Sequence, residues 1–393
     1  MKTREDILSF ILSLKNRNIA LAISTGVGKS RIALEKMKTL KCPTKRILIV
    51  VPVNNLKDTW KAEIIKWNAD VPTVTYEMTT YKSLHKFTGN HYNMVIFDEG
   101  HHISNRVLDI IKIMTFDTSM ILSATLKDML IAQLRIYMPD LCVYRIGTQE
   151  AIDSSILPDL QIILLPIQFN CVDKTEKIIK NSKAKKTMEI PFEKRRFYND
   201  KTTKYIIPCT EFQYNLELDS QVDWYKRKVM GGNQALKNIW LQKAGERLRW
   251  LSSKKTPYLV ALLKKLDKER TLTFCGSIEQ TEVIGKHCIH SKNEDSKEIL
   301  RRFNAGEIDH ITAVAMLDEG ENLYNCKVGI FANINASKRI QVQRVGRILR
   351  HHRPTIILVY FANSREEEII NKMISDYNQD IIHKVKDITE INI

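Results

Sequence analysis

A glycine-rich stretch near the N-terminus, STGVGKS, has the residue types that hold a phosphate chain. Gly26 and Gly28 let the backbone approach an anion closely, so that its N–H groups can point at the oxygens. Lys29 would reach the outer phosphates, and the Ser30 hydroxyl could ligate Mg²⁺. Ile23 stands where the usual pattern begins with glycine, so this is a shorter form of the loop, and the alternative is a chance turn. We expect a nucleoside triphosphate to contact Thr25, Gly26, Val27, Gly28, Lys29 and Ser30.

Two acidic residues, Asp98 and Glu99, follow the apolar run MVIF. Such a run predicts a buried strand, which would place both carboxylates at the sheet edge where ligands of parallel α/β folds bind. Asp98 is suited to hold Mg²⁺ through water, and Glu99 to orient or deprotonate an attacking water. Acidic turns after strands are common without catalysis, but the phosphate loop upstream favours the catalytic interpretation.

Small hydroxyl residues end another predicted strand, in the sequence Ser123-Ala124-Thr125. They could hydrogen-bond the acid pair and relay its state. Alternatively they cap the N-terminus of the next helix, and the two interpretations are compatible.

A second cluster of charged residues lies near the C-terminus, in QRVGRILR. Arg347 and Arg350 are three residues apart, so we expect them to share a helix face. Cleavage of a γ-phosphate needs positive charge near the developing anion, and arginine is suited to that task.

The elements that position these residues alternate between apolar strands and amphipathic helices, which predicts an α/β fold with parallel sheets. We expect three regions: residues 1–150 with the phosphate loop and DEGH, a basic connector and helical insertion at 151–255, and a second sheet at 256–393.

The net charge is +16, and residues 171–270 hold 24 Lys and Arg against 12 Asp and Glu, so most of the excess lies in one quarter of the chain. A polyanion such as nucleic acid would bind such a surface, although a solvated basic face is the alternative. Within 211–252, Trp224, Tyr225, Trp240 and Trp250 alternate with cations. This pattern suits nucleic-acid stacking, or equally a helix core edged by long cationic side chains.

The sequence also indicates the cellular compartment of the protein. No apolar run reaches membrane-spanning length, and the N-terminus lacks a signal-peptide profile, so we expect a soluble, intracellular protein in the cytoplasm or nucleoid, of cellular, phage or viral origin. The seven cysteines are scattered and never spaced C-x-x-C, which indicates reduced thiols and supports neither a zinc nor an iron–sulfur site.

Taken in order, ISTGVGKS, DEGH, SAT, LDEGENL and QRVGRILR resemble the motif series of superfamily 2 helicases and translocases, over nearly the whole chain. The resemblance implies two RecA-like lobes, ATP and Mg²⁺ in the cleft between them, and nucleic acid across both. The implied function is an ATP-dependent helicase or translocase that moves along, or remodels, duplex or branched DNA. The alternatives are an RNA helicase or RNP remodeller, and a catalytically idle nucleic-acid-binding scaffold.

The resemblance also implies a role for each matched residue. Lys29 and Ser30 become triphosphate and Mg²⁺ contacts, Asp98 the Mg²⁺ holder and Glu99 the water activator. The remaining implied roles are coupling for Ser123, Ala124 and Thr125; a hinge on nucleotide and nucleic acid for Gly320 and Asn322; γ-phosphate sensing for Gln343; arginine fingers for Arg347 and Arg350; and nucleic-acid backbone contacts for Pro52, Val53, Thr80, Gly276 and Ser277.

Segments of each half resemble particular branches. VPVNNLKDTWKAEIIKW and DEGHHISN look like duplex-DNA translocases, whereas LDEGENL with QRVGRILRHHRP looks like restriction-enzyme motor subunits, transcription-repair helicases and phage branch-migration helicases. DNA is therefore favoured over RNA. Arg4 to Ile7 occupy the place of the adenine-selecting glutamine motif, which puts base selectivity in doubt. We expect a monomer that grips its substrate through a partner protein or its own basic insertion.

Overall fold

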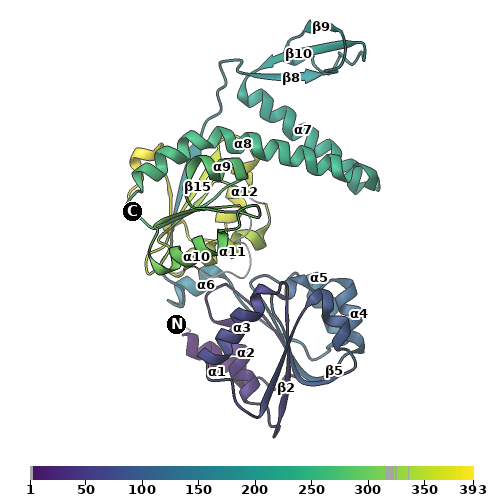
Figure 1. The fold of residues 1–393 in the computed structure, drawn as a ribbon, viewed down its shortest axis with the longest axis vertical. Helices are drawn as coiled ribbons and strands as arrows, with labels where there is room; N and C mark the ends of the chain where they lie inside the picture. The colour runs from purple at the N-terminus through teal and green to yellow at the C-terminus, as the bar shows by residue number, and fades with distance from the viewer. Residues whose placement is uncertain (1–2, 315–322, 324, 335) are drawn as a thin grey trace.

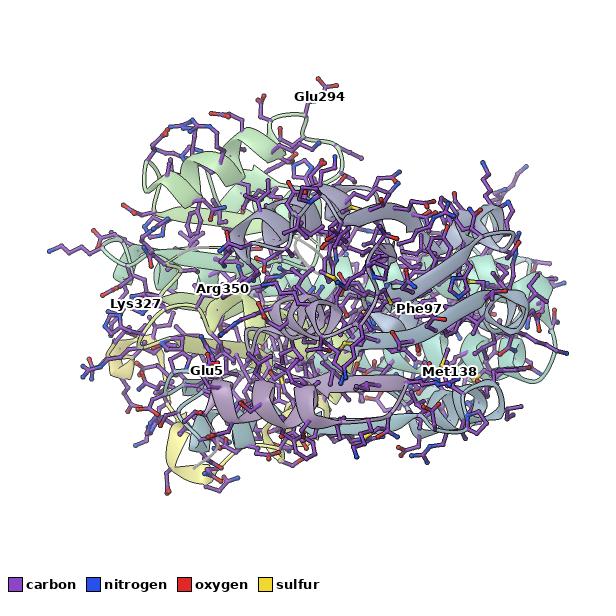
Figure 2. The ribbon with its side chains drawn as sticks, turned by 90° about the horizontal axis from the view of Figure 1, so that it is seen from below. Glu5, Phe97, Met138, Glu294, Lys327 and Arg350 are labelled. Atoms are coloured by element: carbon purple, nitrogen blue, oxygen red, sulfur yellow. The ribbon has the colours of Figure 1, made fainter. Side chains whose placement is uncertain are left out.

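The computed structural model describes residues 3–314, 323, 325–334 and 336–393. Two parallel sheets form two lobes, and a smaller unit projects from the second lobe on the side away from the first (Figure 1). Figure 2 looks from the lobe 1 end, so that Glu5, Phe97 and Met138 of lobe 1 lie in front of lobe 2. None of the described helices is long and apolar enough to cross a membrane.

Lobe 1 is built on a six-stranded sheet in the order β3-β2-β4-β5-β1-β6, and its strand pairings are parallel. The strands are β1 (Asn18–Ile23), β2 (Lys45–Val51), β3 (Val74–Thr80), β4 (His91–Phe97), β5 (Thr115–Ser123) and β6 (Cys142–Ile146). All six residues of β1 are buried, and the apolar run of five residues that follows Asn18 is typical of an internal parallel strand.

Helices cover both faces of this sheet because successive strand residues point to opposite sides. One face packs against α1 (Arg4–Ser13), α2 (Lys29–Lys38) and α3 (Asn55–Lys66). The other packs against η1 (Tyr81–Phe87), α4 (Asn105–Ile113) and α5 (Asp128–Tyr137), and the short η2 (Gly100–His102) follows β4.

Lobe 2 is built on a seven-stranded sheet in the order β12-β13-β11-β14-β15-β7-β16, again with parallel pairings. Its strands are β7 (Gln161–Ile167), β11 (Thr271–Phe274), β12 (Cys288–Ile289), β13 (His310–Ala313), β14 (Val328–Phe331), β15 (Thr355–Phe361) and β16 (Ile382–Lys384). Its helices are α8 (Lys237–Lys265), α9 (Ile278–Ile284), α10 (Ser296–Ala305), α11 (Lys338–Ile348) and α12 (Arg365–Ile374), with the short η5 (Gln379–Ile381) and η6 (Ile388–Glu390).

Two features correct the expected region boundaries. Strand β7 lies in the range expected to be connector, yet it pairs with β15 and β16 inside the lobe 2 sheet. Helix α8 runs unbroken through the expected boundary at residue 255, and Pro257 lies within it. We propose instead that lobe 2 begins at β7 and that the insertion interrupts it between β7 and the second half of α8.

The insertion carries its own small core. A three-stranded sheet in the order β8-β10-β9 is formed by β8 (Glu176–Lys180), β9 (Lys186–Glu189) and β10 (Thr203–Cys209), with η3 (Phe192–Lys194) between the last two strands. It packs through Ile178, Phe192 and Ile207. Helix α7 (Glu211–Met230) then leads through η4 (Gln234–Leu236) into α8, and the two long helices pack together.

Candidate active site

The phosphate loop joins β1 to α2, as predicted. Gly26 and Gly28 have φ values of +92° and +106°, and Gly28 is the residue that precedes the first turn of α2. Positive φ is strained for residues with a Cβ, so the glycines are required by the backbone. No side chain caps the α2 N-terminus, which leaves its N–H groups available to an anion.

Lys29 sits at the start of α2 and points back toward β1. Its Nζ donates to the carbonyl oxygen of Ile23 at 3.0 Å. Burial lowers the pKa of Lys29, whereas the nearby charges of Glu99 and Asp98 raise it and that of Arg347 lowers it. The lysine therefore lies within electrostatic reach of both the acid pair of lobe 1 and an arginine of lobe 2.

Asp98 lies directly after β4, at the sheet edge next to the phosphate loop. Its carboxylate accepts hydrogen bonds from the indole Nε1 of Trp60 at 2.8 Å and from the backbone N–H of Glu99 at 2.9 Å. Burial raises the pKa of Asp98 to about 6, the charge of Glu99 raises it as well, and the Trp60 hydrogen bond and Lys29 lower it. The hydroxyl of Tyr81 donates to the Asp98 carbonyl, which fixes the turn.

Glu99 adopts a left-handed backbone conformation, with φ +47°, which is uncommon for a residue with a side chain. Its Oε2 lies 3.2 Å from Nδ1 of His101, and the same nitrogen lies 3.1 Å from Oγ of Ser123. Ser123 ends β5, and its Oγ donates to the Thr125 carbonyl at 2.8 Å. The acid turn and the Ser123-Ala124-Thr125 segment are thus joined through His101.

The alternative interpretation of this segment, as a helix cap, is wrong. Helix α5 begins at Asp128, and the residue that precedes it is Lys127, which makes no side-chain cap hydrogen bond. The Ser123 and Thr125 hydroxyls are too far back in the chain to cap it.

Lobe 2 supplies its part of the site from α11. A Cβ on Gly346 would lie 2.4 Å from Cβ of Thr25, so only glycine allows α11 to approach the phosphate loop this closely. Gln343 is 3% exposed, and neither its Nε2 nor its Oε1 has a hydrogen-bond partner among the described residues. Buried amides are normally paired, so a group that the structure lacks is expected at this position.

Arg347 is buried at the same interface, 6% exposed, and its charge acts on Lys29. The expectation that Arg350 shares its helix face is wrong, because α11 ends at Ile348 and Arg350 lies in the turn beyond it. The backbone N–H of Arg350 bonds the Ile348 carbonyl.

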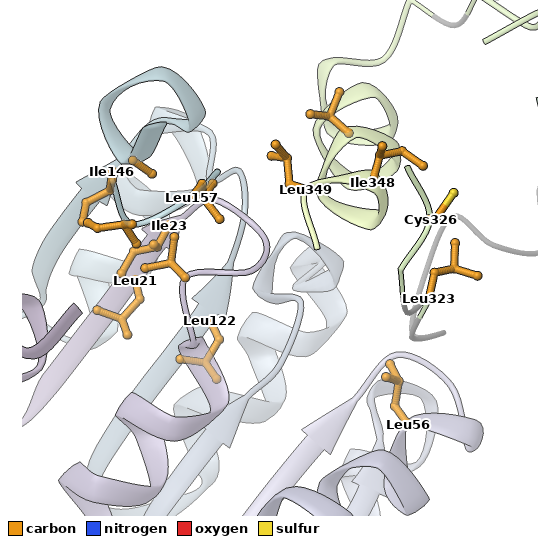
Figure 3. Close-up of a cluster of buried hydrophobic side chains, with 14 of the residues drawn as sticks. Leu21, Ile23, Leu56, Leu122, Ile146, Leu157, Leu323, Cys326, Ile348 and Leu349 are labelled. Carbon is orange, nitrogen blue, oxygen red and sulfur yellow. The ribbon is translucent and has the colours of Figure 1, made fainter. Parts of the chain in front are cut away.

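Apolar contacts hold the two lobes together around this cleft. Figure 3 shows Leu349, at the end of α11, across from Leu157 and Ile23 of the other side, and these residues belong to one buried cluster. Polar contacts fasten the segment between β6 and β7 to lobe 1: Arg4 of α1 donates to the Ile156 carbonyl at 2.9 Å, and Ser24 hydrogen-bonds Thr148 of α6 (Thr148–Asp153) at 3.0 Å.

The predicted nucleic-acid contacts divide into two groups. Val53, after Pro52 at the end of β2, is 43% exposed, and Thr80 is half-buried at the end of β3. Gly276 and Ser277 are buried: a Cβ on Gly276 would lie 2.2 Å from Ser252 Oγ, and the Ser277 hydroxyl caps α9 by accepting from Gln280 N. The prediction for these two is corrected, because α8 covers them and α9 uses their polar groups. Gly320 and Asn322 lie outside the described residues.

The tryptophans of the two long helices include one core residue and one exposed residue. Trp250 packs against Phe169 and Tyr214, and its indole donates to Glu176, so it belongs to a core. Trp224 is 47% exposed near the end of α7, beside Lys228. The side chain of Trp224 could therefore stack on a nucleic-acid base, whereas that of Trp250 is occupied by its core contacts.

The sequence interpretation missed Trp60, His101 and Arg339 as site residues. Arg339 Nη1 lies 3.1 Å from His101 Nε2 and so joins α11 to the acid turn. A signal was present, because Arg339, Gln343 and Arg347 are spaced four apart and must share one helix face. Nothing in the sequence indicated the hydrogen bond of Trp60, since the spacing of Trp60 along α3 is that of an ordinary core residue.

Known protein families match both lobes. Residues 254–352 match the helicase conserved C-terminal domain, and residues 3–77 match the res subunit of type III restriction enzymes. The chain is a superfamily 2 helicase or translocase. It is 24% identical to the DNA 3'-5' translocase XPB2 of Sulfurisphaera tokodaii, over 93% of this chain and 80% of that protein.

Solved helicase structures share the fold of this superfamily 2 member. The helicase domain of Pyrococcus furiosus Hef has a TM-score of 0.53 at 12% identity, covering 94% of this chain and 97% of that one. Saccharomyces cerevisiae Dbp5 bound to RNA and ADP BeF3 has a TM-score of 0.56 at 11% identity, covering 98% and 89%. The type ISP restriction-modification enzyme LlaBIII bound to DNA has a TM-score of 0.58 at 12% identity, covering 99% of this chain but 32% of that enzyme. The predicted architecture of two RecA-like lobes is confirmed.

Proposed function

We propose that this chain is an ATP-dependent DNA translocase or helicase whose ATPase site is the cleft between the lobes. The observation that carries the proposal is that Gly346 of lobe 2 packs directly on Thr25 of the phosphate loop, which brings its buried neighbour Arg347 to the same interface. Residues more than three hundred positions apart therefore meet around one phosphate loop. A cleft that needs both lobes lets the ATPase cycle drive their movement.

The residues present fit ATP and Mg²⁺. The uncapped α2 N-terminus and Lys29 would hold the phosphates, and Ser30 with Asp98 would hold the metal. The amide of Gln343 and the buried hydroxyl of Thr25, which have no hydrogen-bond partner within the described part of the chain, offer further donors to the same space. Mg²⁺, when bound, would neutralise phosphate charge and polarise the transferred group.

Each residue has a defined task in hydrolysis. Glu99 would orient the attacking water and take its proton, because its carboxylate is held at the cleft by the turn after β4. Lys29 would leave the Ile23 carbonyl for the phosphates. Arg347 would neutralise the charge that develops on the leaving phosphates, and it can do so only when lobe 2 is closed on lobe 1. Loss of the γ-phosphate would weaken that closure and let the lobes separate.

DNA is the substrate that we propose, for two reasons. The similar protein of Sulfurisphaera tokodaii is named a DNA translocase, and restriction enzymes match both in family and in fold. The insertion adds an exposed group of three cations, Lys226, Arg227 and Lys228, next to the exposed ring of Trp224. Such a group suits sequence-independent contact with phosphates and bases.

The test is ATPase turnover with duplex, single-stranded, forked and four-way DNA, and with RNA. We expect duplex or branched DNA to stimulate the wild type most. Lys29→Ala and Glu99→Gln should each reduce turnover by at least about a hundredfold, because one loses a phosphate contact and the other the water-activating carboxylate.

Arg301→Ala is the matched control, since Arg301 lies on the surface of α10 and, among the described residues, forms its ion pairs with the nearby Glu298 and Glu307. Turnover that nucleic acid does not change in the wild type would exclude the translocase. Stronger stimulation by RNA than by every DNA would transfer the proposal to an RNA helicase. Full biological function in Glu99→Gln would instead support a catalytically idle scaffold.

A further inference from the structure

The ring of His101 lies between the lobes and contacts both. On the lobe 1 side, Nδ1 is 3.2 Å from Oε2 of Glu99 and 3.1 Å from Oγ of Ser123. On the lobe 2 side, Nε2 is 3.1 Å from Nη1 of Arg339, in the first turn of α11. The side chain of His101 is 13% exposed, so these contacts are largely shielded from water.

Hydrogen-bond chemistry fixes the protonation of this ring from two sides. A guanidinium group can only donate, so Nε2 must carry a lone pair toward Arg339. The single hydroxyl proton of Ser123 goes to the Thr125 carbonyl at 2.8 Å, so Ser123 Oγ accepts from Nδ1. Both contacts require a neutral imidazole with its proton on Nδ1, which is the atom that faces Glu99.

We propose that Arg339 is a positioning residue that, only while the lobes are closed, holds His101 with its Nδ1–H directed at Glu99 and Ser123. The inference rests on the proposed ATPase function, for which Glu99 activates water. A carboxylate that faces a fixed N–H at 3.2 Å is attracted to it and favours one orientation, and general-base catalysis depends on that geometry. When the lobes separate, Arg339 leaves with α11, and the ring is free to turn or to change its protonated nitrogen.

This arrangement gives lobe closure a second effect on hydrolysis beside that of Arg347. Arg347 acts on the phosphates, whereas Arg339 acts on the water-activating side through His101. The spacing of eight residues along α11 places both on one face, so a single movement of the helix would deliver them together.

The experiment is a double-mutant cycle on DNA-stimulated ATPase. Arg339→Ala should lower kcat by roughly tenfold or more and leave KM for ATP nearly unchanged, because nucleotide binding does not use the pair. His101→Asn carries an amide N–H near the position of Nδ1 and has no tautomer to set. In that background Arg339→Ala should cost less than about twofold. An equal loss of kcat in both backgrounds would overturn the proposal.

A second pair of variants keeps the test decisive if His101→Asn does not fold. Arg339→Lys retains an N–H donor to Nε2 and should keep most of kcat, whereas Arg339→Met keeps the length without the donor and should lose it. Equal losses in these two variants would contradict the inference. Arg301→Ala again serves as the control for removing a lobe 2 arginine. A wild type without DNA-stimulated ATPase would overturn the proposed function itself, which is a different result from an additive cycle in an active enzyme.

Discussion

The carboxyl group of Asp98 has a pKa near 6 because it is buried beside Glu99 and only partly compensated by Trp60 and Lys29. As the pH falls through this value, Asp98 takes up a proton and loses the charge that a cation requires. We therefore expect kcat/KM to fall on the acid side of about pH 6, since this parameter reports ionisations of the free enzyme.

Replacing Trp60 by phenylalanine tests the cause of that pKa. The indole hydrogen bond stabilises the charged carboxylate and so lowers its pKa. Trp60→Phe should raise the pKa and move the acid limb of the kcat/KM profile to higher pH. Trp67→Phe, which removes an indole bonded to Glu63 outside the site, should leave the limb in place. An unmoved limb in Trp60→Phe would show that another group controls it.

Residues inside short local patterns were predictable from the sequence. Lys29, Asp98 and Glu99 stand at strand ends and helix starts, and the strand–loop–helix order determines where they lie. The role of Trp60 was not predictable, because its partner Asp98 is brought near by tertiary packing, which periodicity does not encode. The spacing of Arg339 from Gln343 and Arg347 indicated its helix face, but nothing in the sequence indicated its partner His101. Arg350 failed for a local reason, since helix ends are the least predictable part of an element.

Helix α8 is fastened to lobe 2 by a buried ion pair. Lys255 is 1% exposed, and its Nζ donates to Glu366 at 2.7 Å and to the carbonyls of Ala332 and Val359 at 2.7 and 3.0 Å. The second oxygen of Glu366 accepts from Phe361 N. One side chain thereby connects α8, α12, β15 and the residue that follows β14.

Breaking this ion pair should lower the stability of lobe 2. Lys255→Met leaves the Glu366 carboxylate buried without its cation and should lower the free energy of unfolding by about 3–5 kcal/mol. Adding Glu366→Gln should restore part of that loss, because the remaining group is neutral. Lys264→Met, on an exposed position of the same helix, is the control. Urea denaturation measures all three, and equal midpoints for Lys255→Met and Lys264→Met would contradict the assignment.

The alternation of strands and helices was predicted correctly for both lobes because buried parallel strands have unbroken apolar sequences, such as ILIVV in β2. The place of β7 was not predicted. Its pairing with β15 joins residues almost two hundred positions apart, such as Gln161 and Thr355. The local sequence of β7 does not indicate which strand it pairs with.

At the scale of the whole molecule, the excess positive charge predicts salt-dependent DNA binding. Replacing Lys226, Arg227 and Lys228 together by alanine should weaken duplex binding and make the plot of log affinity against log salt shallower by up to about 3, since each phosphate contact contributes about 0.9. ATPase without DNA should not change. Filter binding or anisotropy at several salt concentrations measures the slope.

The control removes three exposed cations elsewhere, Lys15, Arg17 and Lys41, which lie near the N-terminal ends of β1 and β2 and so opposite the cleft edge of the lobe 1 sheet. This control variant changes the net charge by the same amount as the triple variant in the insertion. Equal slopes for the two triple variants would mean that the insertion makes no special contact with DNA.

Because α8 is one continuous helix, the insertion moves with lobe 2 as a rigid lever arm. One half of this 29-residue helix is packed on lobe 2 and the other half carries the projecting unit, so the two turn as one piece. At 1.5 Å per residue the helix is about 44 Å long. A tilt of lobe 2 by only about 5° would sweep the far end of that helix through about 4 Å, close to the rise of about 3.4 Å from one nucleotide to the next. A small closing stroke at the nucleotide would thus be enlarged into a displacement the size of a single base step.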